Sequence, residues 1–221
     1  MSFDEWLDAE ELLEQGAQHR WPERDVSTLE VVEVCHLDLA TGRVVAVDPA
    51  YFHSFEDARP VVAEVAPGTY PVLLSVVAWP STEESHRDSR AVTAATLKIS
   101  DAPVARWEWL DERADGTVLG VGVDAGTACF YDASQRESLA LLSEDEDRVE
   151  AALFEAADAG FAAVPDASGG TAAVFIGCGM GDGFYPIRIG RDASDRVAMV
   201  MIDLELLNHS TGRVDPASNR T

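Results

Sequence analysis

Four aspartates in the second half of the chain stand where strands are expected to end, at positions from which side chains can share a site. They are Asp124 in VGVDAG, Asp132 in FYDAS, Asp182 in GMGDGF and Asp203 in MIDLEL. Carboxylate oxygens are preferred ligands of Mg²⁺ and Ca²⁺, and a bound divalent cation can activate water. These residues are therefore candidate ligands for Mg²⁺ or Ca²⁺, although Asp132 is equally explained as the cap of a helix.

Other catalytic patterns are absent from the sequence. The five histidines show neither H-x-H nor H-E-x-x-H spacing, so no zinc site is predicted. There is no G-x-S-x-G nucleophile motif, and no cysteine stands in a recognisable pattern with a histidine. Cys35, Cys129 and Cys178 lack C-x-x-C spacing and lie in or beside apolar runs, which predicts reduced and mostly buried thiols.

The stretch FIGCGMGDGFYPIRIG has a glycine at every second position from Gly177 to Gly183. A dinucleotide fingerprint needs its glycines to lead into a helix, and a Walker loop needs a following Gly-Lys-Ser/Thr. Here the glycines lead into FYPIRIG, which has the composition of a strand. The Asp-Gly pair favours a structural hairpin turn. The alternative is a loop whose backbone N–H groups bind an anion and whose Asp182 carboxylate binds a cation.

The candidate ligand-binding residues lie in or after two turns, one that contains Asp124 and one that contains Asp182. Arg188 follows the second turn and stands inside an apolar strand, as Arg90 stands at the start of another. A charge in such a place needs a partner. A buried acid is expected for each arginine, and an anionic ligand is the alternative. The candidates are Asp124, Asp182, Gly183, Tyr185 and Arg188.

The VGVDAG stretch has three possible interpretations. In an aspartic protease the residue after the aspartate is Ser or Thr, whereas Ala125 follows Asp124 here and the motif occurs once. An actin-like phosphate motif belongs to a fold with two ATPase halves. A chain of 221 residues with few crossover helices is too short to form both halves. A strand that bends at a glycine, with Asp124 hydrogen-bonded to local backbone, is the favoured interpretation.

Capping patterns and apolar periodicity predict three helices. Ser2 and Glu5 form a capping box before apolar residues at helical spacing, which predicts a helix at about 3–15. Asp132 and Ser143 are expected to cap helices at about 133–142 and 145–159.

Runs rich in β-branched residues predict a sheet that is mostly antiparallel. The first two strands should form a hairpin through the turn ATG, and the last three should form a meander. We therefore expect an α+β fold in one domain, with a β-rich core at about 28–207 and a flexible tail at 208–221. The expected strands are 28–39, 43–49, 68–80, 90–100, 105–111, 116–132, 171–177, 184–190 and 196–207.

The charge of the chain restricts its partners. Sixteen basic and 40 acidic residues give a formal charge of −24, so nucleic acid would be repelled, whereas a basic protein would be attracted. No signal-peptide pattern and no apolar run long enough to span a membrane is present. The sequence predicts a cytoplasmic protein that binds neither nucleic acid nor membrane, and it leaves the oligomeric state open.

Five stretches together carry a resemblance to a known family. VAVDPAYF, APGTYPVLLSV, VGVDAGTACFYD, GDGFYPIRIG and VAMVMIDLELL resemble the bacterial family named domain of unknown function 4241, over about residues 30–207. The family has no characterised function, so the resemblance implies no catalytic residue, cofactor or substrate. It supports one domain with marked positions at Asp48, Gly68, Tyr70, Asp124, Gly126, Asp182, Gly183 and Tyr185.

Two functions follow as hypotheses. The first is a non-catalytic, protein-binding factor of the immunity or accessory kind, which should show an acidic patch around exposed apolar residues. The alternative is a divalent-cation-dependent hydrolase that uses Asp124 and Asp182, whose carboxylates would have to lie close enough to share one ion or a close metal pair.

Overall fold

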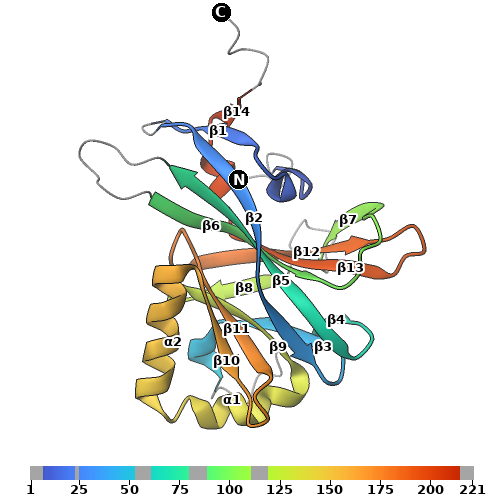
Figure 1. The fold of residues 1–221 in the computed structure, drawn as a ribbon, viewed down its shortest axis with the longest axis vertical. Coiled ribbons are helices and arrows are strands. Elements are labelled where there is room, and N and C mark those ends of the chain that lie inside the picture. Colours follow the sequence, from blue (N-terminus) through green and yellow to red (C-terminus); the bar gives the residue numbers. More distant parts are fainter. Residues whose placement is uncertain (1–6, 23–24, 53–60, 80–88, 111–118, 215–221) are drawn as a thin grey trace, which may run out of the picture.

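The computed structural model describes residues 7–22, 25–52, 61–79, 89–110 and 119–214. Two antiparallel sheets pack on one another, and two helices cover the outer face of the smaller sheet (Figure 1). The fold is therefore α+β with a predominance of antiparallel strands, as predicted. No helix in the described ranges is long and apolar enough to cross a membrane.

The larger sheet has nine strands in the order β14-β1-β2-β5-β6-β13-β12-β7, and β8 pairs with β12 beside this path. Its strands are β1 (Gln18–Arg20), β2 (Ser27–Leu39), β5 (Gly68–Trp79), β6 (Ser89–Lys98), β7 (Arg106–Trp109), β8 (Gly120–Val123), β12 (Gly183–Arg191), β13 (Val197–Asp203) and β14 (Gly212–Arg213).

The smaller sheet has five strands in the order β10-β11-β9-β3-β4. Its outer face packs against α1 and α2, and α1 follows a short 3₁₀ turn at Ala133–Gln135. The elements are β3 (Arg43–Val47), β4 (Val61–Glu64), β9 (Thr127–Asp132), α1 (Arg136–Leu142), α2 (Glu146–Ala159), β10 (Phe161–Pro165) and β11 (Thr171–Gly177).

Apolar side chains form three layers of core. The largest lies between the sheets and includes Leu74 of β5, Phe130 of β9 and Ile187 of β12. A second lies between the smaller sheet and the helices. The third covers the outer face of the larger sheet, where Leu12 and Leu207 pack on Met201. Both faces of each sheet are therefore buried over much of their area.

Four connections among the described residues carry the chain from one sheet to the other, at 40–42, 65–67, 124–126 and 178–182. These crossings correct three predictions. β2 and β3 do not form a hairpin, because β2 pairs with β5 and β3 pairs with β9. The stretch 116–132 contains two strands in different sheets, not one. β11 also leaves the expected meander, because it pairs with β9 and β10, and β12–β13 remains as a hairpin.

The two helices predicted in the middle of the chain are present, whereas the helix predicted near the N-terminus is not found in its described residues. Asp132 caps the helical segment that includes α1, and Gly160 ends α2 with a φ of 89°. Asp145, not Ser143, caps α2, since its carboxylate accepts a hydrogen bond from Arg148 N. Residues 3–6 of the expected helix at 3–15 lie outside the described residues, and over 7–15 there is only a 3₁₀ turn at Glu11–Leu13.

The structure describes residues 208–214 of the expected tail. Leu206–His209 forms a 3₁₀ turn, and β14 pairs with β1 through His19 and Arg213. Residues 215–221 of the predicted tail lie outside the described residues.

Candidate functional site

A buried carboxylate joins the end of β3 to the β8–β9 turn. Asp48 is fully buried, and its Oδ1 accepts a hydrogen bond from Ala50 N at 2.8 Å. Its Oδ2 accepts from the backbone N–H groups of Asp124 at 2.6 Å and Ala125 at 3.1 Å. Asp48 therefore fixes the turn that carries the candidate Asp124 and satisfies N–H groups that would otherwise lack partners. Among the sequence signals, only the family resemblance marked Asp48.

Asp124 lies in an exposed turn, as expected, but its carboxylate has a different partner. It accepts a hydrogen bond from the hydroxyl of Tyr51, in the 3₁₀ turn Pro49–Tyr51 that Asp48 caps. Among the described residues this carboxylate shows no bond to local backbone, contrary to the prediction; the N–H groups of Asp124 and Ala125 donate to Asp48 instead. Tyr51 was not identified from the sequence, because its contact with Asp124 spans 73 residues.

Asp182 and Tyr185 stabilise the crossing from β11 to β12. Asp182 Oδ1 accepts a hydrogen bond from Gly126 N at 3.0 Å, and Gly126 O accepts one from Cys178 N at 2.8 Å. The Tyr185 hydroxyl donates to Gly181 O at 2.7 Å. Since β11 and β12 belong to different sheets, the predicted hairpin at this loop is wrong. The glycine loop is instead a sheet-to-sheet connection held to the 124–126 turn.

The same device occurs at the crossing from β4 to β5. There the Tyr70 hydroxyl donates to Ala66 O at 2.7 Å, four residues earlier in the chain. A side chain at Gly68 would meet the Tyr70 ring at 3.2 Å, and one at Gly183 would meet the Tyr185 ring at 3.5 Å. The repeated Gly-x-Tyr-Pro pattern is therefore a structural motif in which each tyrosine covers its own turn. Burial raises the pKa of the Tyr185 hydroxyl above its ordinary value, so this group stays protonated.

Asp132 and Asp203 lie away from this pair of turns. Asp132 ends β9, and Asp124 lies just before the start of that strand. β9 has six residues and spans about 20 Å. It accepts hydrogen bonds from Thr41 N at 3.0 Å and Ser134 N at 2.9 Å. Burial alone would raise the pKa of Asp132, but the hydrogen bonds from Ser134 and Thr41 lower it overall. Asp132 thus stabilises the 40–42 crossing and the helix start.

Asp203 forms a buried ion pair with Arg188. Arg188 Nη2 lies 2.6 Å from Asp203 Oδ2, and its guanidinium carbon lies 4.1 Å from the centre of the Trp109 ring. Burial raises the pKa of Asp203, and the attraction to Arg188 opposes that rise. The expected buried acid partner of Arg188 is confirmed. Tyr185 and Ile187 face the core between the sheets, so by strand alternation Arg188 points to the opposite face.

The predicted metal ligands therefore divide among separate places. Asp182 bonds to Gly126 in the turn that also contains Asp124, whereas Asp132 and Asp203 serve other contacts. Within the ranges that the structure describes, no three His, Cys, Asp or Glu side chains form a group that could hold a metal ion.

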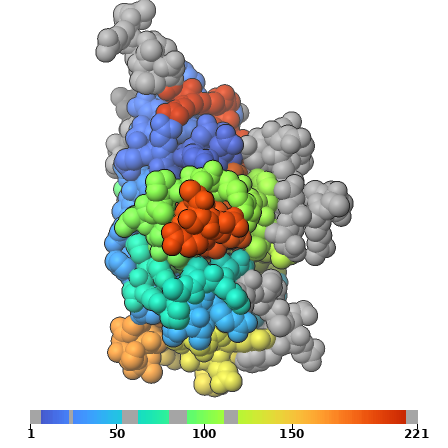
Figure 2. Space-filling view, turned by 90° about the vertical axis from the view of Figure 1, so that its right-hand side faces the viewer, coloured from blue at the N-terminus to red at the C-terminus, as the bar shows by residue number. Residues whose placement is uncertain are grey.

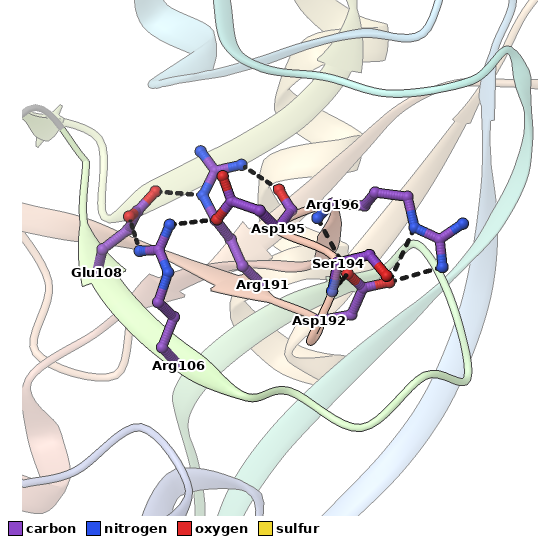
Figure 3. Close-up of polar contacts among 7 residues, drawn as sticks. All are labelled: Arg106, Glu108, Arg191, Asp192, Ser194, Asp195 and Arg196. Atoms are coloured by element: carbon purple, nitrogen blue, oxygen red, sulfur yellow. Dashed lines mark hydrogen bonds and ion pairs between the residues drawn. The ribbon is translucent and has the colours of Figure 1, made fainter.

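A network of three arginines and three acids lies at the end of the β12–β13 hairpin (Figure 3). Glu108 accepts hydrogen bonds from Arg106 and Arg191, and Asp192 from Arg196. Burial alone would raise the pKa of Glu108, but Arg106 and Arg191 lower it. Figure 2 shows the hairpin end between the β7 segment and the β4–β5 segment. Because each of these arginines has an acidic partner, the cluster is a structural network and not an open anion site.

The cysteines match the prediction of free and mostly buried thiols. Cys129 and Cys178 are buried and Cys35 is half-buried, and none forms a disulfide. Burial raises the pKa of Cys178 to about 12 and that of Cys35 to about 11. Thiols with such pKa values are poor nucleophiles at neutral pH.

The helices present a surface that was not identified from the sequence. Leu141 of α1 is 67% exposed and Phe154 of α2 is 66% exposed. Leu141 lines a shallow hollow with the acidic stretch 144–147, and Phe154 lines a groove with Glu150 and Asp158. Residues 136–159 contain eight acidic and two basic residues. We use the name acidic helical face for these exposed apolar and acidic residues of α1, α2 and their connection: Leu141, Phe154, Glu144, Asp145, Glu146, Asp147, Glu150, Glu155 and Asp158.

The groove beside Phe154 has a volume of about 780 Å³. Its floor comes from the larger sheet, including Val32, Leu74 and Val92, and one wall comes from α2. Gly126 and Gly179 line it as well, so the two crossings that contain Asp124 and Asp182 border the groove.

Comparisons with known proteins identify the family of this chain. No match was found among curated proteins or among solved structures. Residues 37–202 match the model of a family described as "Protein of unknown function (DUF4241)". The match spans the Asp48 turn, the 124–126 turn and both Gly-x-Tyr-Pro motifs, which are the parts of the chain that fix the crossings between the sheets. The chain belongs to the DUF4241 family.

Proposed function

We propose that this protein acts in the cytoplasm as a non-catalytic, protein-binding factor of the immunity or accessory kind. Its acidic helical face would bind a basic protein partner. The observation that carries the proposal is the exposure of Leu141 and Phe154, at 67% and 66%, next to clustered carboxylates. Large apolar side chains within a polar rim are typical of protein interaction sites.

Electrostatics supports this choice of partner. The whole chain carries a formal charge of −24, and the helical segment adds a local excess of carboxylates. Such a field raises the rate at which a basic partner meets the surface and disfavours acidic competitors. The buried apolar contacts would then supply most of the affinity.

The contacts of the family-marked residues also favour a non-catalytic role. Asp48, Asp182 and Tyr185 each bond to backbone groups at the crossings. These contacts give each of the three residues a role in the fold, so their presence does not require a reaction.

The proposal is tested with a double variant, Leu141→Ser with Phe154→Ser, and a matched control, Val26→Ser. Val26 is also an exposed apolar residue, at 36%, and lies outside the helices. Each immobilised protein is exposed to extract from the source cells, and retained proteins are quantified. We expect a basic protein that is retained by the wild type and the control, reduced at least about tenfold on the double variant, and released as salt is raised. Equal retention on all three proteins would exclude this surface as the binding site.

The hydrolase alternative is favoured by one contact, since Asp182 bonds to the same turn that carries Asp124. It requires a divalent cation at this turn. Thermal unfolding of the wild type and Asp182→Asn with Mg²⁺, Mn²⁺ or Ca²⁺ tests it. A cation at about a hundred times its Kd would stabilise the wild type by roughly 2.7 kcal/mol. If no cation raises the Tm of the wild type by more than it raises the Tm of the variant, the hydrolase is excluded.

A further inference from the structure

The groove lies between α2 and strands β2, β5 and β6 of the larger sheet. Val32, Val34 and Val76 of the larger sheet line its floor, and Val32 remains 40% exposed. On the other side, Leu153 and Phe154 of α2 form the wall. The volume of about 780 Å³ falls within the range of about 300–1,000 Å³ that is typical of ligand sites. The groove can therefore take several apolar side chains.

The charges at its mouth favour a cationic occupant. Glu150 and Asp158 lie at the rim on α2. Arg90 also lines the groove, but it forms an ion pair with Glu30 of β2. The arginine is thus neutralised locally, whereas no described basic residue other than Arg90 lines the groove to offset the two α2 carboxylates.

Phe154 connects the groove to the acidic helical face. Its side chain is exposed and lines the groove, so one partner segment could contact both. An occupant with apolar side chains on one face and basic side chains on the other satisfies the floor and the rim together.

We propose that the groove binds a basic amphipathic segment of the protein partner, with the apolar side chains of that segment inserted between α2 and strands β2, β5 and β6. This inference rests on the proposed protein-binding function and names the part of the partner that the groove takes. A small apolar molecule is the competing occupant, and the test separates the two.

The probe is a fluorescent peptide of about 14 residues made of leucine and lysine, with leucines at helical i, i+3, i+4 and i+7 spacing. A peptide of the same composition in scrambled order is the control. The key variant is Ala157→Phe, because Ala157 is exposed and lines the groove, so phenylalanine there fills it. Ala151→Phe is the matched control, because Ala151 is exposed on the same helix and is not part of the lining. Val32→Ser is a second variant, on the floor.

We expect the wild type and Ala151→Phe to bind the amphipathic peptide with equal affinity by fluorescence anisotropy. Binding should weaken at least about tenfold in Ala157→Phe and in Val32→Ser. Adding about 0.5 M NaCl should weaken the binding of the peptide to the wild type. The inference is wrong if the scrambled peptide binds equally well, or if filling the groove has no effect. It is also wrong if the neutral dye Nile red occupies the groove and the peptide does not displace it, since the occupant would then be a small apolar molecule.

The two proposals fail in different ways. If the natural partner is lost on Leu141→Ser with Phe154→Ser but is retained by Ala157→Phe, the groove inference fails and the protein-binding function stands. If neither variant loses a partner, the proposed function fails. Circular dichroism of each variant shows that the fold is retained.

Discussion

Buried aspartates in this protein stabilise turns by accepting hydrogen bonds from backbone N–H groups. Asp48 accepts three such bonds, and two of them come from a turn 76 and 77 residues away. A buried carboxylate is costly unless hydrogen-bond donors satisfy it, so these bonds contribute to the stability of the fold. Asp124 differs because it is exposed and bonds to the side chain of Tyr51.

The first prediction compares Asp48→Ala with Asp124→Ala. Removing the Asp48 carboxylate leaves the N–H groups of Asp124 and Ala125 without their acceptor, so we expect the free energy of unfolding to fall by about 2–4 kcal/mol. Asp124→Ala should cost less than about 1 kcal/mol, because the site is exposed. Urea denaturation measures both. Equal losses would contradict the structural role of Asp48.

The second prediction concerns pH and His19. Burial, followed by the nearby positive charge of Arg213, lowers the pKa of His19 below its ordinary value of 6.5, while Glu14 opposes the shift. Neither ring nitrogen has a hydrogen-bond partner among the described residues. Below about pH 6.5 the unfolded chain therefore binds a proton at this residue that the folded protein does not. The free energy of unfolding must then decrease as the pH is lowered.

His19→Phe removes this titration. The free energy of unfolding of the wild type should decrease between about pH 7 and 5, and the decrease should be smaller in the variant. Denaturation curves at several pH values provide the measurement, and His36→Phe, at an exposed position, serves as the control. Parallel pH profiles for the wild type and His19→Phe would show that His19 does not contribute.

At the scale of elements, the crossings between sheets decide the fold. Gly42 shows how local geometry permits one of them. It has a φ of 72°, and a Cβ at this position would lie 2.0 Å from the carbonyl oxygen of Val65. The 40–42 and 65–67 crossings therefore lie against each other, and only glycine allows the close approach.

The third prediction compares Gly42→Ala with Gly169→Ala. Both glycines have a positive φ, but a Cβ at Gly169 meets no atom within 4 Å. Gly169→Ala should cost about 1–2 kcal/mol from backbone strain alone. Gly42→Ala should cost a further 1–3 kcal/mol, approximately, from the clash with Val65. Urea denaturation distinguishes the two effects, and equal losses would show that packing around Gly42 relaxes freely.

At the scale of the whole molecule, the sheets share one large core. Residues of both sheets, such as Leu97 and Phe130, belong to the same apolar cluster. The four crossings connect the sheets covalently along the chain. One sheet should therefore not unfold without exposing the inner face of the other.

The fourth prediction is a single unfolding transition, which tests the expectation of one domain. Trp79, Trp107 and Trp109 report on the larger sheet through fluorescence, whereas the helical signal in circular dichroism reports on α1 and α2 beside the smaller sheet. The two signals should change at the same urea concentration. Two separate midpoints would mean that the chain has two independently stable units.

Features that depend on neighbouring residues were predictable from the amino-acid sequence. The helices at 133–142 and 145–159 were predicted to within one residue of their observed limits, counting the 3₁₀ turn that precedes α1. Strands such as Gly68–Trp79 followed from β-branched runs between turn residues. These features could be predicted because capping bonds and side-chain periodicity act within one element. The family was also recognisable from its motifs.

Only the tertiary structure decided which strands pair and what the marked residues do. ATG and GDG look like hairpin turns locally, yet both crossings lead into the other sheet. The local signals at such turns are similar, and the choice depends on which distant strands can bury their apolar faces. Asp48 and Tyr51 bond to partners more than 70 residues away, and the groove forms where strands β2, β5 and β6 face α2. Such relations follow from the packing of distant segments, which no local pattern encodes.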